Sequence, residues 1–333
     1  MGPPDGEGIM PRFLLGLAFT SVSVAFLWWL VDWDTTLDVL KNADPVYIAL
    51  AVTCLVLSLV AKTVRWRLLL PASASVSTPR LYRILHISFL INNVLPARLG
   101  DVVRVTMTTR QPGVRLGHVL SSLMTERVTD SVTLLAGFVL VSPLLPLPDP
   151  YKPWLHAAWV AMAIVSAIFL VAVAFPRQAA RLGRRVAIHR RLPLGERMRA
   201  ESASFREGWV QLASRRRFVP IWGVSWIAWI GAFAINYLLM RALNIDAPIA
   251  VAVLITCTTN LAMLAPSTPG YIGVFHTAAA LSLIPFNVAD STAVSFAILA
   301  HLVNVVPVSL IGAVFLLLGR ESFSFRRIPE QGA

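Results

Sequence analysis

The sequence predicts an all-α polytopic membrane protein, an inverted repeat with about six full spans and two re-entrant helical hairpins. Its 333 residues are 56% hydrophobic and have a mean hydropathy of +0.70. Several uncharged runs are long enough to cross ~30 Å of hydrocarbon, which takes ~20 residues. These runs are residues 13–31, 154–175, 218–240 and 291–319. The third observation is that basic residues gather in the loops between them.

The first run, residues 13–31, also has some features of a signal peptide. It is long for such a core and no small-residue cleavage site follows it, so we interpret it as a retained span. The net charge of +12 lies mostly in loops, which is typical of membrane topology and not of a basic groove for nucleic acid. Cys54 and Cys257 both lie in apolar runs, which argues against a disulfide framework.

Loop charges predict the side of the membrane on which each loop lies. Residues 32–44 carry four Asp and one Lys, so we expect them outside. Residues 62–83 carry five basic residues and no acid, which favours the cytoplasm. The long loop 176–217 carries twelve Arg against three Glu, and the tail after Gly319 is also basic. Both termini are therefore predicted to be cytoplasmic.

The first hairpin is predicted from an apolar segment that is too short to span easily. Residues 80–95 would form a helix of about 24 Å at 1.5 Å per residue. Arg80 and Arg83 flank it on one side, and Arg98, Arg104 and further Arg residues follow Pro96. Both ends therefore prefer the cytoplasm, and the chain is expected to turn near residues 96–100.

The second hairpin is predicted within residues 248–287, which hold no charged side chain. The stretch "APSTPGYIG", residues 265–273, has two Pro and two Gly and cannot continue one regular helix. The neighbouring spans run outward and back, so this hairpin enters from the opposite face. In the alternative, the hairpin halves cross the membrane fully by tilt or bilayer thinning, which gives eight spans.

This order divides the chain into two inverted halves, residues 12–147 and 154–319. Each half reads span, span, hairpin, span, and the two halves begin on opposite sides of the membrane. Inverted repeats of this kind are common in secondary transporters, whose substrate sites lie where broken helices of the two halves meet.

Three motifs carry the candidate substrate site. The first is "NNVLPARLGDVVR", in which the helix after Pro96 would begin inside the membrane and turn free N–H groups toward an anion. Arg residues would add charge suited to phosphate, and an Asp would pair with one of them. In the alternative, the Arg side chains only reach the cytoplasmic headgroups. The candidate residues are Asn92, Asn93, Pro96, Arg98, Gly100, Asp101 and Arg104.

The second motif is "TERVTD" in the span that begins near Gly117. Glu126 and Asp130 are four residues apart and share a helix face, while Arg127 lies on another. Ionisable groups within spans usually face the protein interior. We expect either a polar network that positions Arg127 or relays protons, or an ion pair that locks this span to the first hairpin.

The third motif is "PSTPGYIGVFH". Its hydroxyls and the N–H groups around two Gly would cup an anion, and its His would take part; a satisfied structural His is the alternative. The candidate residues are Ser267, Thr268, Pro269, Gly270, Gly273 and His276, while His301 is expected to be a packing contact. The sequence has no convincing catalytic or metal-ligand spacing, so neither an enzyme nor a cofactor is expected.

Together the three motifs resemble the flippase-like transmembrane domain of lysylphosphatidylglycerol synthases and its stand-alone bacterial and archaeal relatives. The family pattern is approximately N-x-x-x-P-x-x-x-G-E-x-x-R, then E-R-x-x-D, then P-x-x-P-G-x-x-G-x-x-E. Here these read "NVLPARLGDVVR", "ERVTD" and "PSTPGYIGVFH". Asp101 replaces one Glu and keeps its charge, whereas His276 replaces the other and removes it. No aminoacyl-transferase domain is expected.

The resemblance implies a flippase of the bacterial or archaeal cytoplasmic membrane. Its expected partner is an anionic membrane lipid or a lipid-linked glycan precursor, moved between leaflets, and a separate lipid-modifying enzyme or glycosyltransferase is a further candidate partner. The alternatives are a membrane-embedded enzyme that acts on a lipid phosphate and an accessory subunit of a glycosyltransferase.

Overall fold

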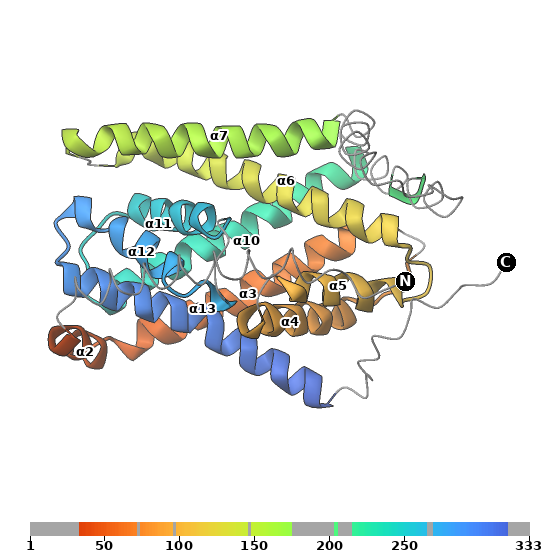
Figure 1. Ribbon diagram of the computed structural model, residues 1–333, viewed down its shortest axis with the longest axis horizontal. Coiled ribbons are helices and arrows are strands. Elements are labelled where there is room, and N and C mark those ends of the chain that lie inside the picture. Colours follow the sequence, from red (N-terminus) through yellow and green to blue (C-terminus); the bar gives the residue numbers. More distant parts are fainter. Residues whose placement is uncertain are drawn as a thin grey trace, which may run out of the picture.

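The computed structural model describes residues 33–71, 74–95, 98–145, 148–174, 203–205, 215–264 and 269–318, and it confirms the all-α membrane class (Figure 1). The predicted first span and most of the basic loop lie outside these residues. The main helices are α2 (Trp33–Lys41), α3 (Pro45–Leu69), α4 (Thr78–Val94), α5 (Leu99–Thr109), α6 (Leu116–Val141), α7 (Lys152–Ala174), α10 (Arg215–Ala242), α11 (Ile249–Ala262), α12 (Val274–Leu281) and α13 (Asp290–Leu318). Short 3-10 turns lie between them: η2 (Ser142–Leu144), η3 (Asp149–Tyr151), η4 (Pro269–Tyr271) and η5 (Ile284–Phe286).

Four helices of the described residues are long and apolar enough to cross a membrane. They are Pro45–Leu69, Leu116–Leu144, Arg217–Ala242 and Asp290–Leu318. Helices satisfy their own backbone N–H and C=O groups, which hydrocarbon cannot do, so long apolar runs become helices. The 23-residue α7 matches the predicted span 154–175 closely.

Helices α3 and α10 form an antiparallel pair through the middle of the bundle. At one end the backbone N–H of Asp44 donates to the carbonyl of Ala242 (2.9 Å). At the other, Nη1 of Arg217 donates to the carbonyl of Leu70 (3.1 Å). Between them, the Ser58 hydroxyl donates to the carbonyl of Ala228 (2.6 Å), a contact typical of closely packed membrane helices.

Each predicted hairpin consists of two short helices that pack against each other. Helices α4 and α5 form the first hairpin at one end of the bundle, and α11 and α12 form the second at the other end (Figure 1). Their longest member, α4, has 17 residues and is about 26 Å long, short of a full hydrocarbon crossing. Both hairpins therefore end inside the bundle, where their breaks meet.

The last helix of each predicted half packs against the hairpin of the other half. Helix α13 lies along α4, and α6 contacts α11. Gly312 in α13 fits against the carbonyl of His86, to which an added Cβ would come within 2.5 Å. Gly137, toward the C-terminal end of α6, faces Phe233 and Val253. This reciprocal packing of each last helix on the other half's hairpin fits two inverted halves. Their division at residues 12–147 and 154–319 stays a prediction.

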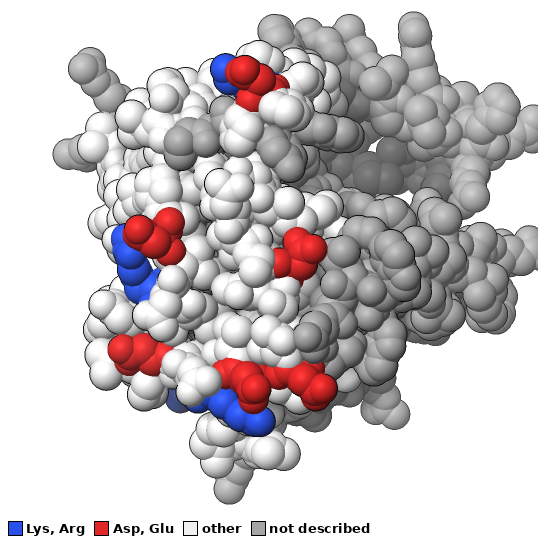
Figure 2. Space-filling view, turned by 90° about the vertical axis from the view of Figure 1, so that its left-hand side faces the viewer, with Lys and Arg blue, Asp and Glu red and all other residues white. Residues whose placement is uncertain are grey.

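The two ends of the bundle differ in charge. The end at the left of Figure 1 exposes carboxylates, which are red in Figure 2. Asp38 in α2, Asp149 in η3 and Asp246 between α10 and α11 are exposed at this end. At the opposite ends of the helices lie the basic residues Arg67, Arg80, Arg83, Arg115 and Arg217. The segment 62–83, expected to be a loop, is mostly helical, because the apolar run of α3 continues to Leu69.

Replacing Gly312 by Ala should destabilise the packing of α13 on α4, because the new methyl group would collide with the backbone carbonyl of His86. We expect a lower thermal unfolding midpoint for the purified protein in detergent. Gly223→Ala in α10 is the matched control, since a Cβ there meets nothing within 4 Å and Ala favours a helix. Equal midpoints for the two variants would contradict the close approach.

The charge asymmetry predicts the membrane orientation. In a variant without Cys54 and Cys257, single cysteines at positions 75 and 111 should react with an impermeant thiol reagent only from the cytoplasm. Cysteines at positions 246 and 290 should react only from outside. Labelling of positions 75 and 111 from opposite sides would mean that the first hairpin crosses the membrane.

Candidate functional site

A buried ion pair with two hydrogen bonds joins the first hairpin to α6. Nη1 and Nη2 of Arg104 donate to the two carboxylate oxygens of Glu126 at 3.2 and 2.7 Å. Only 3% of the Arg104 side chain is exposed, and its guanidinium lies 3.9 Å from the ring centroid of Trp66. Arg104 is therefore paired with Glu126 in this structure, and its predicted contact with a substrate anion stays a prediction. The pairing with Glu126 matches the alternative of an ion pair that locks the span to the hairpin.

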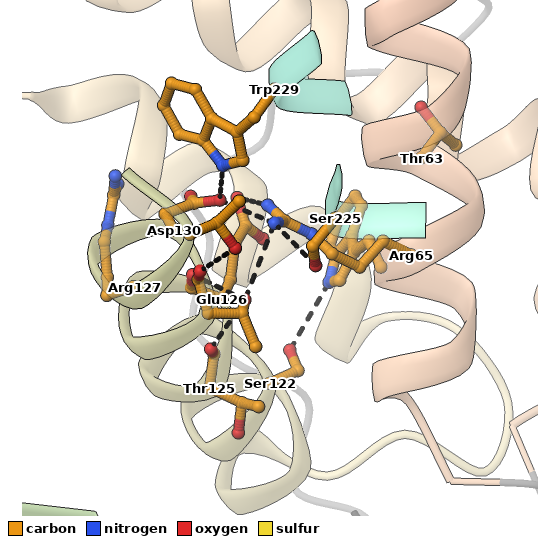
Figure 3. A network of polar contacts seen from close by, with 12 residues as sticks. Thr63, Arg65, Ser122, Thr125, Glu126, Arg127, Asp130, Ser225 and Trp229 are labelled. Atoms are coloured by element: carbon orange, nitrogen blue, oxygen red, sulfur yellow. Dashed lines mark hydrogen bonds and ion pairs between the residues drawn. The ribbon is translucent and has the colours of Figure 1, made fainter. Parts of the chain in front are cut away.

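A second buried cation, Arg65 of α3, completes this network (Figure 3). Its Nη1 donates to Oδ1 of Asp130 at 2.5 Å, and its Nη2 lies 3.8 Å from Oε1 of Glu126. The hydroxyl of Ser225 and the indole of Trp229, both on α10, also contact Arg65 and Asp130, respectively. The network thus joins α3, α5, α6 and α10 through charges that would be costly to leave unpaired.

Asp101 has different partners from those expected. The sequence predicts a pair with Arg98 or Arg104, but Oδ2 of Asp101 lies 3.7 Å from Nη2 of Arg127. Figure 3 shows Arg127 on the side of α6 away from Arg65. The physical reason is burial: Arg104 is drawn into the interior by Glu126, and Asp101 remains at the half-exposed edge of the network with Arg127. The expectation that the acidic pair on α6 positions Arg127 is therefore replaced by this contact.

The beginning of α5 is already capped from within the hairpin. The N–H of Gly100 donates to the side-chain oxygen of Asn92 (2.8 Å), and the Asn92 amide donates to Asp101 (3.3 Å). A Cβ at Gly100 would collide with the carbonyl of Ser88, so only Gly allows α5 to lie this close to α4. The motif predicts free N–H groups at the start of α5, but the N–H of Gly100 is already bonded to Asn92 in this structure.

The breaks of the two hairpins meet at a set of contacts that we call the hairpin junction: Asn93 and Arg98 with Met263, Gly270 and Tyr271. Nη2 of Arg98 donates to the carbonyl of Met263 (2.7 Å) at the end of α11. The Arg98 guanidinium lies 5.6 Å from the Tyr271 ring centroid. A Cβ at Gly270, whose φ is 69°, would lie 3.4 Å from the carbonyl of Asn93. Asn93 also donates to the hydroxyl of Ser309 in α13 (2.9 Å).

The second hairpin contributes no Asp, Glu, Lys or Arg to the site, in contrast to the first hairpin. His276 stacks on His301 of α13, with ring centroids 4.6 Å apart, which confirms His301 as a helix packing contact. The N–H of Gly273 donates to Nδ1 of His276 (3.3 Å) in this structure, and the predicted anion cup around Gly270 and Gly273 stays a prediction. Pro96, Ser267 and Thr268 lie outside the described residues, as does the side chain of Pro269.

Sequence reasoning missed Lys62, Arg65 and Trp229 as parts of the site. Lys62 and Arg65 were assigned to a cytoplasmic loop, although apolar residues continue on both sides of them to Leu70. Nζ of Lys62 lies 5.1 Å from the ring centroid of Trp229. The available signal is that apolar residues continue beyond the two cations, which indicates that both lie on a span.

The site has more cations than carboxylates. Lys62, Arg65, Arg98, Arg104 and Arg127 stand against Asp101, Glu126 and Asp130, which is a formal surplus of two positive charges. Within the described part of the chain, Lys62 and Arg98 have no carboxylate within 4.0 Å, and no group of three His, Cys, Asp or Glu could hold a metal ion. The arrangement is suited to a phosphate group.

Comparison with known proteins agrees with the motifs. The family model of the lysylphosphatidylglycerol synthase TM region matches residues 13–312. A UPF0104 membrane protein of Pyrococcus horikoshii is 22% identical over 94% of this chain and 98% of its own length. A UPF0104 membrane protein of Methanothermobacter thermautotrophicus is 26% identical over 71% and 74%. The glycosyltransferase AglD of Haloferax volcanii is 33% identical, but over only 38% of this chain and 21% of its own.

Glu126→Gln should destabilise the protein by about 3–5 kcal/mol, because Arg104 would lose its buried carboxylate. The double variant Arg104→Gln/Glu126→Gln removes both charges and should recover part of this loss. Thermal unfolding in detergent measures both, and Asp149→Asn, which breaks an exposed ion pair with Lys152, serves as the control that leaves the midpoint unchanged. A double variant less stable than Glu126→Gln would contradict the pairing.

Proposed function

The chain belongs to the family of the lysylphosphatidylglycerol synthase TM region, and on this premise we propose that it is a lipid flippase. The lipid carries phosphate in its headgroup, as an anionic phospholipid or a polyprenyl-phosphate-linked glycan precursor does. The observation that carries the proposal is the surplus of cations over carboxylates in the candidate site, with Arg98 at the hairpin junction, inside a multi-pass integral membrane protein.

Two properties of that surplus favour a phosphate headgroup. Lys62 lies over the ring of Trp229, and Arg98 contacts the ring of Tyr271 and the carbonyl of Met263. In the described part of the chain, neither has a carboxylate within 4.0 Å that a phosphate would have to displace. Unpaired charges at this depth are costly, and an anion that reaches them gains the compensation that the protein does not supply. The fork of donors on Arg98 also matches phosphate oxygens.

In this proposal, the headgroup passes between the two membrane surfaces through the region where the hairpins meet. The hairpins enter from opposite ends, so the junction lies between the two surfaces, as the substrate sites of inverted-repeat transporters do. The basic end faces the cytoplasm of a bacterial or archaeal cell, both termini included, and the acidic end faces outside. The two inverted halves, residues 12–147 and 154–319, would move relative to each other around the junction.

A second candidate function is that of an accessory subunit of a glycosyltransferase, favoured by the partial similarity to AglD. A membrane-embedded enzyme acting on a lipid phosphate is the third, without an observation of its own. Exchange of lipid between leaflets by the purified protein alone would favour the flippase over the accessory subunit. A lipid whose mass is unchanged after exchange would favour the flippase over the enzyme.

Purified protein in liposomes should exchange fluorescent phosphatidylglycerol between leaflets faster than phosphatidylcholine, with both lipids unchanged by mass spectrometry. Lys62→Gln should slow the exchange of phosphatidylglycerol by about tenfold or more, since charge-assisted contacts contribute roughly 1.5–3 kcal/mol. Arg241→Gln, at the acidic end, is the matched control that retains the natural rate. Equal exchange of both lipids by the natural protein would contradict the proposal.

A further inference from the structure

Arg98 is the contact through which the two hairpins hold each other. It begins α5 in the first hairpin, and its guanidinium bonds the carbonyl of Met263, which closes α11 in the second. Its other partner is the ring of Tyr271, in the short turn before α12. Arg98 therefore touches both sides of the break in the second hairpin.

Neither partner neutralises the charge of Arg98. Arg65, Arg104 and Arg127 all have carboxylate partners, whereas Arg98 has a carbonyl and an aromatic face in the described part of the structure. Hydrogen bonds between an ionised donor and an ionised acceptor are stronger than those to a neutral carbonyl. A phosphate that reaches Arg98 would therefore outcompete the partners it has in this structure.

The backbone on both sides of this contact is strained. Arg98 has φ 54° and Tyr271 has φ 57°, the left-handed region that side chains other than Gly rarely adopt. Strained backbone of this kind concentrates at ligand clamps and switch regions. Here the two strained residues face each other across the junction of the hairpins.

We infer that Arg98 is an exchangeable contact, which leaves Met263 and Tyr271 for the headgroup phosphate and thereby releases the two hairpins from each other. The inference rests on the proposed function and deepens it, because it makes release of the junction a consequence of phosphate binding. Tyr271 acts in this scheme as a competitor of the lipid for the same guanidinium.

The competition gives two substitutions opposite effects. Arg98→Gln removes the charge and should weaken binding of dioctanoyl phosphatidylglycerol by about ten- to a hundredfold. Tyr271→Leu removes the competing ring and should tighten binding by about two- to tenfold. Both are measured by calorimetric titration of the purified full chain in phosphatidylcholine nanodiscs. A merely structural role of Tyr271 would give weaker binding in both variants.

The chain offers a matched control for the ring substitution. At the acidic end, the Arg241 guanidinium lies 5.1 Å from the ring centroid of Tyr237, an arrangement like that of Arg98 and Tyr271. Tyr237→Leu should leave the affinity for phosphatidylglycerol unchanged. Thermal unfolding confirms that each variant is folded before its titration is interpreted.

Parallel titrations with inorganic phosphate separate a lipid from free phosphate. Tighter binding of phosphatidylglycerol by Tyr271→Leu supports the inference, and tighter binding of inorganic phosphate alone overturns the lipid as the competitor. If the natural protein binds phosphatidylglycerol but Tyr271→Leu does not bind it more tightly, the exchange is wrong and the proposed function stands. If the natural protein binds no anionic lipid above phosphatidylcholine, the proposed function fails as well.

Discussion

The buried ion pairs of Arg104 with Glu126 and of Arg65 with Asp130 constrain the rest of the bundle. A charge inside a membrane span must be matched where it lies, because neither hydrocarbon nor an apolar neighbour compensates it. Matching these charges fixes α5 against α6, and α6 against α3 and α10. The first hairpin can therefore end within the bundle, although its helices are too short to cross the membrane.

The two hairpins meet this constraint in different ways. The first hairpin brings charges into the site, and the second brings the neutral stack of His276 on His301 together with the carbonyl of Met263. The junction therefore joins a strongly charged side to a weakly polar one. In the proposed transport, an anion is held from the charged side, while the other side offers few interactions that would retain it.

Much of the fold could be predicted because apolar runs and loop charges are local properties of the chain. The predicted spans 218–240 and 291–319 correspond to α10 and α13, and the breaks near Pro96 and Gly270 separate the hairpin helices. The partners within the site could not be predicted in the same way. Asp101 is three residues from both Arg98 and Arg104, yet it pairs with Arg127 of another helix. Sequence spacing states which residues are near each other along a helix, but burial decides which charge takes which partner.

The sequence by itself determined that this chain forms membrane helices, that two of its segments break, and that cations concentrate near one break. Each of these follows from hydrophobicity, from the backbone limits of Pro and Gly, or from the cost of charge in lipid. The tertiary structure decided that Arg65 belongs to the interior, that Arg104 is paired with Glu126, and that Arg98 bridges the hairpins through neutral partners. These outcomes depend on α3 and α11 being brought beside helices far away in the chain, and no local pattern records such an approach.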